Sequence, residues 1–189
     1  MRESLAMNLL KTLLFTLFVP GSVTLLVPYL LYSSDNPGLP GFLRHVKAFG
    51  AIAVVVGACI YAICAWDFVA QGKGTPAPID PPRALVSRRL YRLIRNPMYL
   101  GVLAVLLGES LLLDSAALLI YTAVVFVGFH LFVIGYEEPR LRRRFGEEYM
   151  EYRGRVPRWF PRVGAWLSHN PDKDHEEQSH GPPSGTPEG

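Results

Sequence analysis

Hydrophobic residues along the chain gather into long uninterrupted blocks instead of alternating with polar positions. A transmembrane helix needs about 20 mainly apolar residues to cross a hydrocarbon core ~30 Å thick. The third block is shorter, at ~24 Å of helix, and makes a marginal crossing. The pattern predicts an all-α integral membrane protein with about four transmembrane helices. We expect the crossings over residues 9–32, 46–70, 98–113 and 116–136.

Turn-forming residues indicate how these blocks are connected. Asp114 and Ser115 separate the last two blocks by a very tight turn, which predicts a C-terminal helical hairpin. Pro97 is favoured at the first position of a helix and should start the third block. Residues 71–82, QGKGTPAPIDPP, are too rich in Gly and Pro for a helix and should form a loop. The basic stretch 83–96 fits either a short surface helix or an ordered loop.

Two of the blocks contain residues that affect helix packing. Pro20 and Pro28 lie inside the first block, where a proline is tolerated but makes a kink plausible. Small residues on one helix allow the backbone of a neighbouring helix to approach closely. The second block offers four of them: Gly50, Ala53, Gly57 and Ala58.

Charge adds an orientation to this picture. Half of the residues are hydrophobic, and the net charge is only +3. Six Lys or Arg residues nevertheless fall within 73–95 against one acid, and eight Arg residues fall within 140–162. Basic clusters beside long apolar blocks mark cytoplasmic flanks, so we expect both termini in the cytoplasm and 33–47 outside. The same setting argues against nucleic-acid binding as the reason for these clusters.

The organisation along the chain is that of a single domain with a tail. We expect one membrane domain over residues 1–167 and a disordered polar tail over 168–189. The histidines in this tail are too loosely spaced to predict a metal site. Cys59 and Cys64 match neither a metal motif nor a disulfide framework, so we interpret them as small packing residues.

Charged residues at the two open ends of the predicted hairpin should come together in space. Arg95–Tyr99 starts the third crossing, and Glu137–Glu138 follows the fourth, so an antiparallel hairpin places them side by side. Negative charge at a helix C-terminus is disfavoured by the helix dipole and calls for compensation. Either the nearby arginines or a bound ligand can supply it, and the spacing does not decide between them. Glu109, inside the third crossing, faces the bundle interior or reaches the outer interface.

Three motifs resemble the isoprenylcysteine carboxyl methyltransferase family and its prokaryotic relatives. They read GKGTPAPIDPPRALV, YRLIRNPMYLG and EEPRLRRRFGEEYMEYRGRVPRWFPR, and they also echo the membrane phospholipid methyltransferases. The resemblance implies cytoplasmic segments and a hairpin mouth that bind S-adenosyl-L-methionine. Arg95 and Glu138 are supporting candidates, and no catalytic residue is assigned. The matching cofactor contacts are Arg83, Ala84, Leu85, Val86, Tyr91, Asn96, Pro97, Met98, Tyr99 and Glu137.

Three positions depart from the family pattern. Asn96 stands where the eukaryotic enzymes have histidine, although an asparagine still offers a donor and an acceptor. Arg89 occupies a place usually held by glycine. Val133 replaces a substrate-contacting arginine one turn before the glutamates, so an acceptor carboxylate would lose a charge-assisted partner.

The resemblance implies a transferase that methylates a membrane-associated or lipophilic acceptor: a carboxylate, a thiol or a lipid amine. Its partners would be the lipid bilayer and a lipophilic or lipidated acceptor, and we expect it in a bacterial inner membrane. Two alternatives stay open. One is a membrane reductase of the sterol-reductase type with a nicotinamide cofactor, and the other is a non-catalytic membrane protein that binds lipid or a partner.

Overall fold

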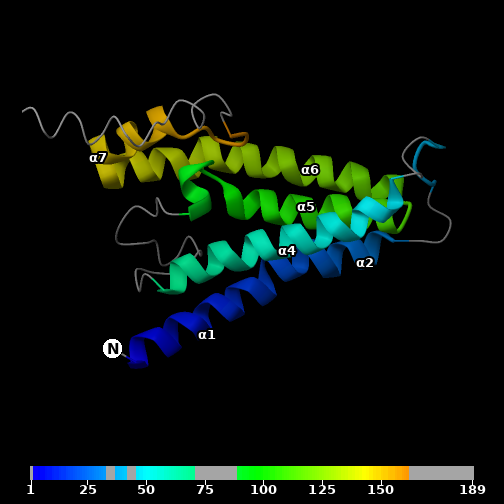
Figure 1. Ribbon diagram of the computed structural model, residues 1–189, viewed down its shortest axis with the longest axis horizontal. Coiled ribbons are helices and arrows are strands. Elements are labelled where there is room, and N and C mark those ends of the chain that lie inside the picture. The colour runs from blue at the N-terminus through cyan, green and yellow to red at the C-terminus, as the bar shows by residue number, and fades with distance from the viewer. Residues whose placement is uncertain (1, 33–36, 42–45, 71–88, 162–189) are drawn as a thin grey trace, which may run out of the picture.

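The structure is a computed structural model that describes residues 2–32, 37–41, 46–70 and 89–161. Long helices run side by side in it, and the regular elements of these ranges are all helical (Figure 1). The elements are α1 (Arg2–Phe18), the π-helical turn η1 (Ser22–Leu26), α2 (Val27–Leu31), α4 (Lys47–Ala70), the 3₁₀ turn η2 (Arg89–Arg92), α5 (Pro97–Leu112), α6 (Ala116–Phe132), the π-helical turn η3 (Val133–Glu137) and α7 (Glu138–Arg155).

Within these described ranges, three helical stretches are long and apolar enough to cross a membrane. They comprise Leu9–Leu31, Lys47–Ala70 and the first part of Ala116–Arg155, and most of their residues are not buried inside the protein. Lipid rather than protein is the natural cover for such apolar surface. Over the described residues the all-α prediction is therefore confirmed, with three helical stretches that suit a membrane by length and composition. The predicted third crossing corresponds to α5, a shorter apolar helix of 16 residues.

The closest helix contact in the bundle is between α4 and α5, and glycines make it. A Cβ atom on Gly57 would lie 2.5 Å from the carbonyl oxygen of Gly101, and one on Gly50 would lie 2.7 Å from that of Gly108. These distances are below any real Cβ contact, so only glycine fits there. The two glycine pairs thus bring both backbones together, as the small residues of the second block predict.

Two π-helical turns each come just before a proline. η1 precedes Pro28, and η3 precedes Pro139. Proline lacks an N–H group and its ring clashes with the carbonyl four residues earlier. A wider turn relieves both problems: the N–H of Val27 reaches the oxygen of Ser22, and that of Glu138 reaches the oxygen of Val133. The irregularity predicted for the first block is therefore the π-helical turn η1 before Pro28.

The prediction that the glutamate pair stands at a helix end is wrong, whereas the end of the membrane crossing at residue 136 stays a prediction. The helix continues through η3 into α7, and its first break is at Gly146, whose φ is +54°. Hydropathy drops at residue 136 because charged residues begin there, but residues such as Arg, Glu, Leu and Met still favour a helix. The glutamate pair therefore lies inside a continuous helix, and the argument from an unfavourable dipole at a helix end does not apply.

The hairpin turn between α5 and α6 is as tight as predicted. Asp114 adopts a positive φ of 50°, and its Oδ1 accepts a hydrogen bond of 2.9 Å from the backbone N–H of Leu39. Ser115 then caps α6 by accepting from the N–H of Leu118 at 3.4 Å. This turn sends α6 back along α5, and so brings the two ends of the hairpin together.

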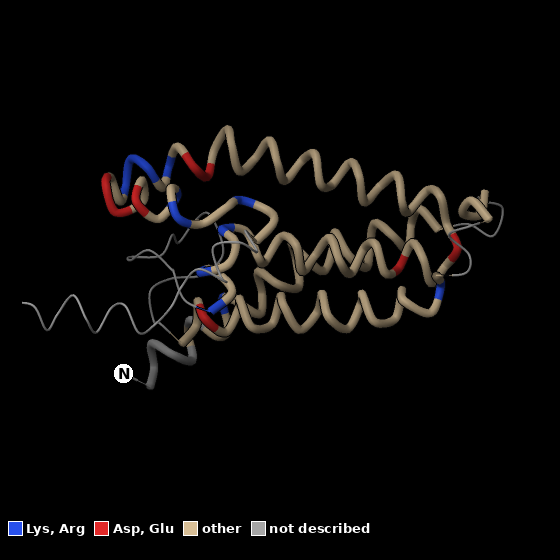
Figure 2. The backbone as a smooth tube through the Cα atoms, turned by 45° about the horizontal axis from the view of Figure 1, so that its top comes forward, with Lys and Arg blue, Asp and Glu red and all other residues tan. Residues whose placement is uncertain are grey.

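Charged residues gather at the opposite end of the bundle, where α4 ends, α5 begins and α6 passes into α7 (Figure 2). We call this the polar end. The C-terminal segment 156–161 folds back over it, and the backbone N–H of Arg95 donates to the carbonyl of Pro157 at 2.9 Å. Because α4, α5 and α6 all reach this end, it is the place where side chains from distant parts of the chain meet.

Candidate functional site

A direct hydrogen bond joins the two ends of the hairpin. The hydroxyl of Tyr99, in the first turn of α5, donates to Oε2 of Glu137 at 2.9 Å. The Tyr99 ring also packs on Phe129 of α6, with 4.7 Å between ring centroids. Phenol and carboxylate are both only partly exposed. The convergence of the third-crossing start and the acidic pair that the hairpin predicts is thus present in the fold.

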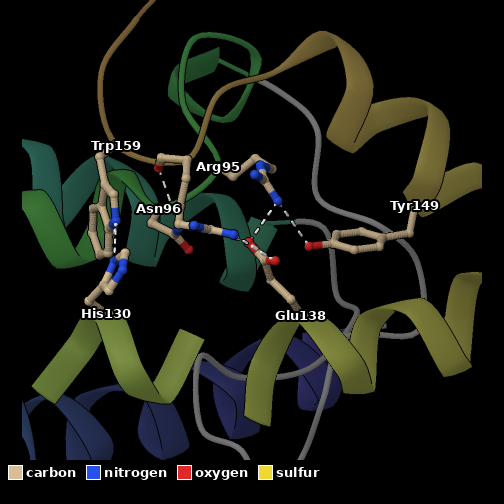
Figure 3. Close-up of polar contacts among 7 residues, drawn as sticks. Arg95, Asn96, His130, Glu138, Tyr149 and Trp159 are labelled. Carbon is tan, nitrogen blue, oxygen red and sulfur yellow. Dashed lines mark hydrogen bonds and ion pairs between the residues drawn. The ribbon is translucent and has the colours of Figure 1, made fainter. Parts of the chain in front are cut away.

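The neighbouring Glu138 has different partners (Figure 3). Its Oε1 accepts from Arg95 at 2.8 Å and from Arg158 at 2.7 Å, and its Oε2 accepts from Arg158 at 3.0 Å. Arg95 also donates to the hydroxyl of Tyr149 at 3.3 Å. Only 9% of the Glu138 side chain is exposed. This carboxylate therefore clamps the segment before α5 and the C-terminal segment onto α7.

The charge state of Glu138 follows from this surrounding. Burial alone would raise the pKa of its carboxyl, but the hydrogen bond from Arg158 and the positive charges of Arg95, Arg158 and Arg153 outweigh burial. The pKa of Glu138 consequently lies below its ordinary value. The arginines thus compensate one glutamate of the pair, and Glu137 is the one that hydrogen-bonds across to α5.

A second contact fastens the C-terminal segment to α6. The indole N–H of Trp159 donates to Nδ1 of His130 at 3.0 Å, and its ring packs against Phe126 with centroids 5.4 Å apart. Asn96 donates its side-chain amide to the carbonyl of Arg158 at 3.3 Å (Figure 3). Trp159 is therefore packed against protein, whereas Phe160 is 76% exposed.

Asn96 uses its amide in this way and does not cap α5, which begins at Pro97. The first backbone N–H groups of a helix have no partner inside the helix. The leading N–H groups of α5 include those of Met98 and Tyr99. The polar end thus carries a carboxylate that is held by the phenol of Tyr99, and the N-terminus of α5 with its backbone donors.

Tyr91, in η2, lies on the α4 side of the same region. It is 9% exposed and packs with Cys64, and its ring meets that of Phe68 edge-on with centroids 6.1 Å apart. Burial raises the pKa of the Tyr91 phenol, and the negative charge of Glu137 acts in the same direction. Tyr152 of α7 donates its hydroxyl to the Tyr91 carbonyl at 2.7 Å. Tyr91 thus connects α4, α7 and the neighbourhood of Glu137.

Arg89, where the family pattern usually has glycine, has a positive φ of 47°. Glycine adopts this left-handed conformation without steric cost, whereas residues with a Cβ adopt it at a cost in free energy. The departure noted in the sequence therefore falls at a position whose backbone favours glycine.

The fold brings together six of the residues named from the sequence, together with the supporting Arg95 and Glu138. Arg83, Ala84, Leu85 and Val86 lie outside the described residues, as do the loop 71–82 and the tail. The sequence interpretation missed the role of Arg158 and the pairing of His130 with Trp159, because nothing local in the sequence connects them. The six are Tyr91, Asn96, Pro97, Met98, Tyr99 and Glu137.

The helical hairpin with a polar site at its mouth defines an integral membrane protein of the small polytopic class. Residues 43–148 match the family model described as phospholipid methyltransferase. This match extends from α4 into α7 and includes both Tyr99 and Glu137.

Two plant proteins are similar over most of their length. Protein-S-isoprenylcysteine O-methyltransferase A of Arabidopsis thaliana is 30% identical over 148 residues, which is 75% of this chain and 74% of that protein. Protein-S-isoprenylcysteine O-methyltransferase B of the same plant is 28% identical with the same coverage. No solved structure matches the chain significantly. The chain belongs to the phospholipid methyltransferase family, is related to the isoprenylcysteine methyltransferases, and is a membrane methyltransferase.

Proposed function

We propose that this protein transfers a methyl group from S-adenosyl-L-methionine to a lipophilic acceptor at the polar end of the bundle. The observation that carries the proposal is the hydrogen bond between Tyr99 and Glu137. It fixes a carboxylate to a side chain of the first turn of α5, whose leading backbone N–H groups have no partner inside the helix, and both lie within the family match. A carboxylate beside N–H donors complements a zwitterion, and the amino-acid part of this methyl donor is one.

The chain supplies binding and alignment in this proposal. S-adenosyl-L-methionine, when bound, offers an electrophilic methyl group that an acceptor nucleophile takes in one displacement, with S-adenosylhomocysteine as the leaving product. Glu137 binds the positive part of the donor, and the α5 N–H groups bind its carboxylate. The clamp around Glu138 holds 156–161 over the polar end and limits access of water. Alignment and exclusion of water are the main demands of such a transfer.

The acceptor class is a carboxylate, a thiolate or a lipid amine. Val133, one turn before Glu137, is 1% exposed and carries no charge that would pair with an acceptor carboxylate. The relatives' names specify an isoprenylcysteine acceptor in the plant proteins and a phospholipid in the family model. A lipid amine must first lose a proton, whereas a carboxylate or thiolate reacts as it is. The acceptor reaches the site from the bilayer, and the methyl donor reaches it from the cytoplasm.

We infer that the polar end faces the cytoplasm of a bacterial inner membrane, with both termini on that side, and the arginines of this end support the cytoplasmic orientation. Accessibility of single cysteines to a membrane-impermeant thiol reagent tests this orientation. A cysteine that replaces Glu148 should react only after the membrane is permeabilised. A cysteine that replaces Leu113 should react in intact cells.

Binding of S-adenosylhomocysteine to the purified protein in detergent tests the function. We expect saturable binding that weakens about 10-fold in Glu137→Gln and in Tyr99→Phe, because each loses one polar contact. Glu148→Gln and Tyr29→Phe are matched controls, since both side chains are exposed, and they should bind like the wild type. Binding of a reduced nicotinamide instead would support a reductase, and binding of neither would contradict catalysis with these cofactors.

Incubation of enriched membranes with methyl-labelled S-adenosyl-L-methionine then identifies the acceptor. Label in a phospholipid fraction indicates a lipid amine as the acceptor. Base-labile label on protein indicates a carboxylate, and label in a small lipophilic thioether indicates a thiol. Membranes that carry Glu137→Gln provide the background.

A further inference from the structure

Asp67 is a buried acid in the last turn of α4, at the polar end of the bundle. Asp67 is 5% exposed, and Nη1 of Arg89 lies 3.5 Å from its Oδ1. Within the described part of the chain, its Oδ2 is buried and has no hydrogen-bond partner. Burying a carboxylate oxygen without a donor is unfavourable, and so is a negative charge at a helix C-terminus.

A purely structural ion pair does not account for this arrangement. The Arg89 side chain is 59% exposed, and pairs with an exposed partner contribute little to stability. Arg89 moreover adopts a positive φ, which costs free energy for a residue with a Cβ. The pair balances the charge of Asp67 but leaves half of its carboxylate unsatisfied.

The position of Asp67 connects it to the site. Its chain neighbour Phe68 meets the Tyr91 ring edge-on, and Cys64, one turn earlier, packs on Tyr91 as well. Glu137, at the junction of α6 and α7, is near enough for its charge to raise the pKa of the Tyr91 phenol, after the larger effect of burial. The part of α4 that carries Asp67 therefore contacts Tyr91, and Tyr91 in turn is near Glu137 of a different helix.

We propose that Asp67 is a further binding residue for the methyl donor, and that its Oδ2 accepts a hydrogen bond from a ribose hydroxyl. This inference rests on the proposed function. Because Arg89 already neutralises the carboxylate, a neutral hydroxyl suits the free oxygen better than a second cation. Acidic side chains recognise ribose hydroxyls in this way at other nucleotide sites. The amino-acid end of the donor remains with Glu137 and the start of α5.

A comparison of two ligands in detergent tests the proposal. S-adenosylhomocysteine carries both ribose hydroxyls, and its 2′,3′-dideoxy analogue carries neither. We expect the wild type to bind the first at least 10-fold more tightly. In Asp67→Ala this ratio should fall to about 1, and in Asp67→Asn it should fall at least about threefold, because a neutral acceptor makes a weaker hydrogen bond. Glu151→Gln, an exposed acid of α7, is the matched control and should keep the wild-type ratio.

The ratio separates recognition from folding, because damage to the fold weakens both ligands alike. An unchanged ratio in Asp67→Ala overturns the proposal. If Asp67→Ala does not fold, the isosteric Asp67→Asn decides, and an unchanged ratio there overturns it too. A wild type that binds S-adenosylhomocysteine but not more tightly than the dideoxy analogue also overturns it, while leaving the proposed function intact. A wild type that binds neither ligand refutes the proposed function itself.

Discussion

Replacing Glu138 by glutamine should destabilise the protein far more than the same change at an exposed acid. Glu138 accepts three hydrogen bonds from two arginines, and the side chains of Arg95 and Glu138 are 10% and 9% exposed. Removing one partner of a buried pair leaves an uncompensated charge and costs roughly 3–5 kcal/mol. Arg158 is more exposed, at 24%, and water can compensate part of its loss. We therefore expect a loss of about 3 kcal/mol.

The matched change is Glu151→Gln. Glu151 and Arg155 pair along α7, but their side chains are 63% and 77% exposed. Exposed helix pairs contribute only about 0.3–0.5 kcal/mol. Thermal unfolding in a mild detergent, followed by tryptophan fluorescence, compares the two variants. A difference of about 3 kcal/mol corresponds to a fall in Tm of about 6–12 °C for a chain of this length.

The fluorescence also reports where the structure fails. With Trp66 and Trp166 both replaced by Phe, the remaining Trp159 sits in the segment that Glu138 clamps, so Glu138→Gln should shift its emission to longer wavelength before the helices unfold. Equal Tm values for Glu138→Gln and Glu151→Gln, with unchanged emission, would refute the view that Glu138 is the central tie of the polar end. Glu137 would then need to be reconsidered as the structural member of the pair.

Three further outcomes follow from the same contacts. Gly57→Ala should lower the free energy of unfolding by about 1–3 kcal/mol, because the new Cβ would lie 2.5 Å from a backbone oxygen. Gly128 has open space around it, so Gly128→Ala should leave the free energy of unfolding unchanged in the same assay. Glu138 has a lowered pKa, so its contribution is fully present above its ordinary value of 4.5 and is lost as pH falls through the folded pKa. The wild type should therefore lose Tm below about pH 4.5 more steeply than Glu138→Gln, and parallel curves would contradict this. Trp159→Phe keeps the ring but removes the donor to His130, so it should cost about 1 kcal/mol and loosen 156–161 in hydrogen exchange.

Much of the fold could be predicted because the membrane makes hydrophobicity a direct signal. Apolar blocks of sufficient length must be helical in lipid, since every backbone polar group needs a partner there. The helix start at Pro97 and the tight turn at Asp114 are local features that a short stretch of sequence specifies. The antiparallel hairpin, and with it the approach of Tyr99 to Glu137, follows from that turn.

Hydropathy was a poor guide to where the last helix ends. It marks the edge of the apolar stretch, but the helix runs on through η3 into α7, because backbone hydrogen bonds do not depend on whether side chains meet lipid or water. Only one side of the glycine contact between α4 and α5 could be predicted from the sequence. The sequence shows Gly50 and Gly57 on one helix, whereas their partners are set by how the two helices cross.

The sequence by itself determined the helices, the hairpin and the identity of the acidic pair, because each depends on neighbouring residues or on hydropathy over one block. Only the tertiary structure decided the division of labour within that pair. Glu138 is neutralised by Arg95 and Arg158, which lie 43 and 20 residues away along the chain, while Glu137 meets α5. Adjacent identical residues look equivalent in sequence. Their environments differ because successive side chains of a helix point in different directions, toward different neighbours.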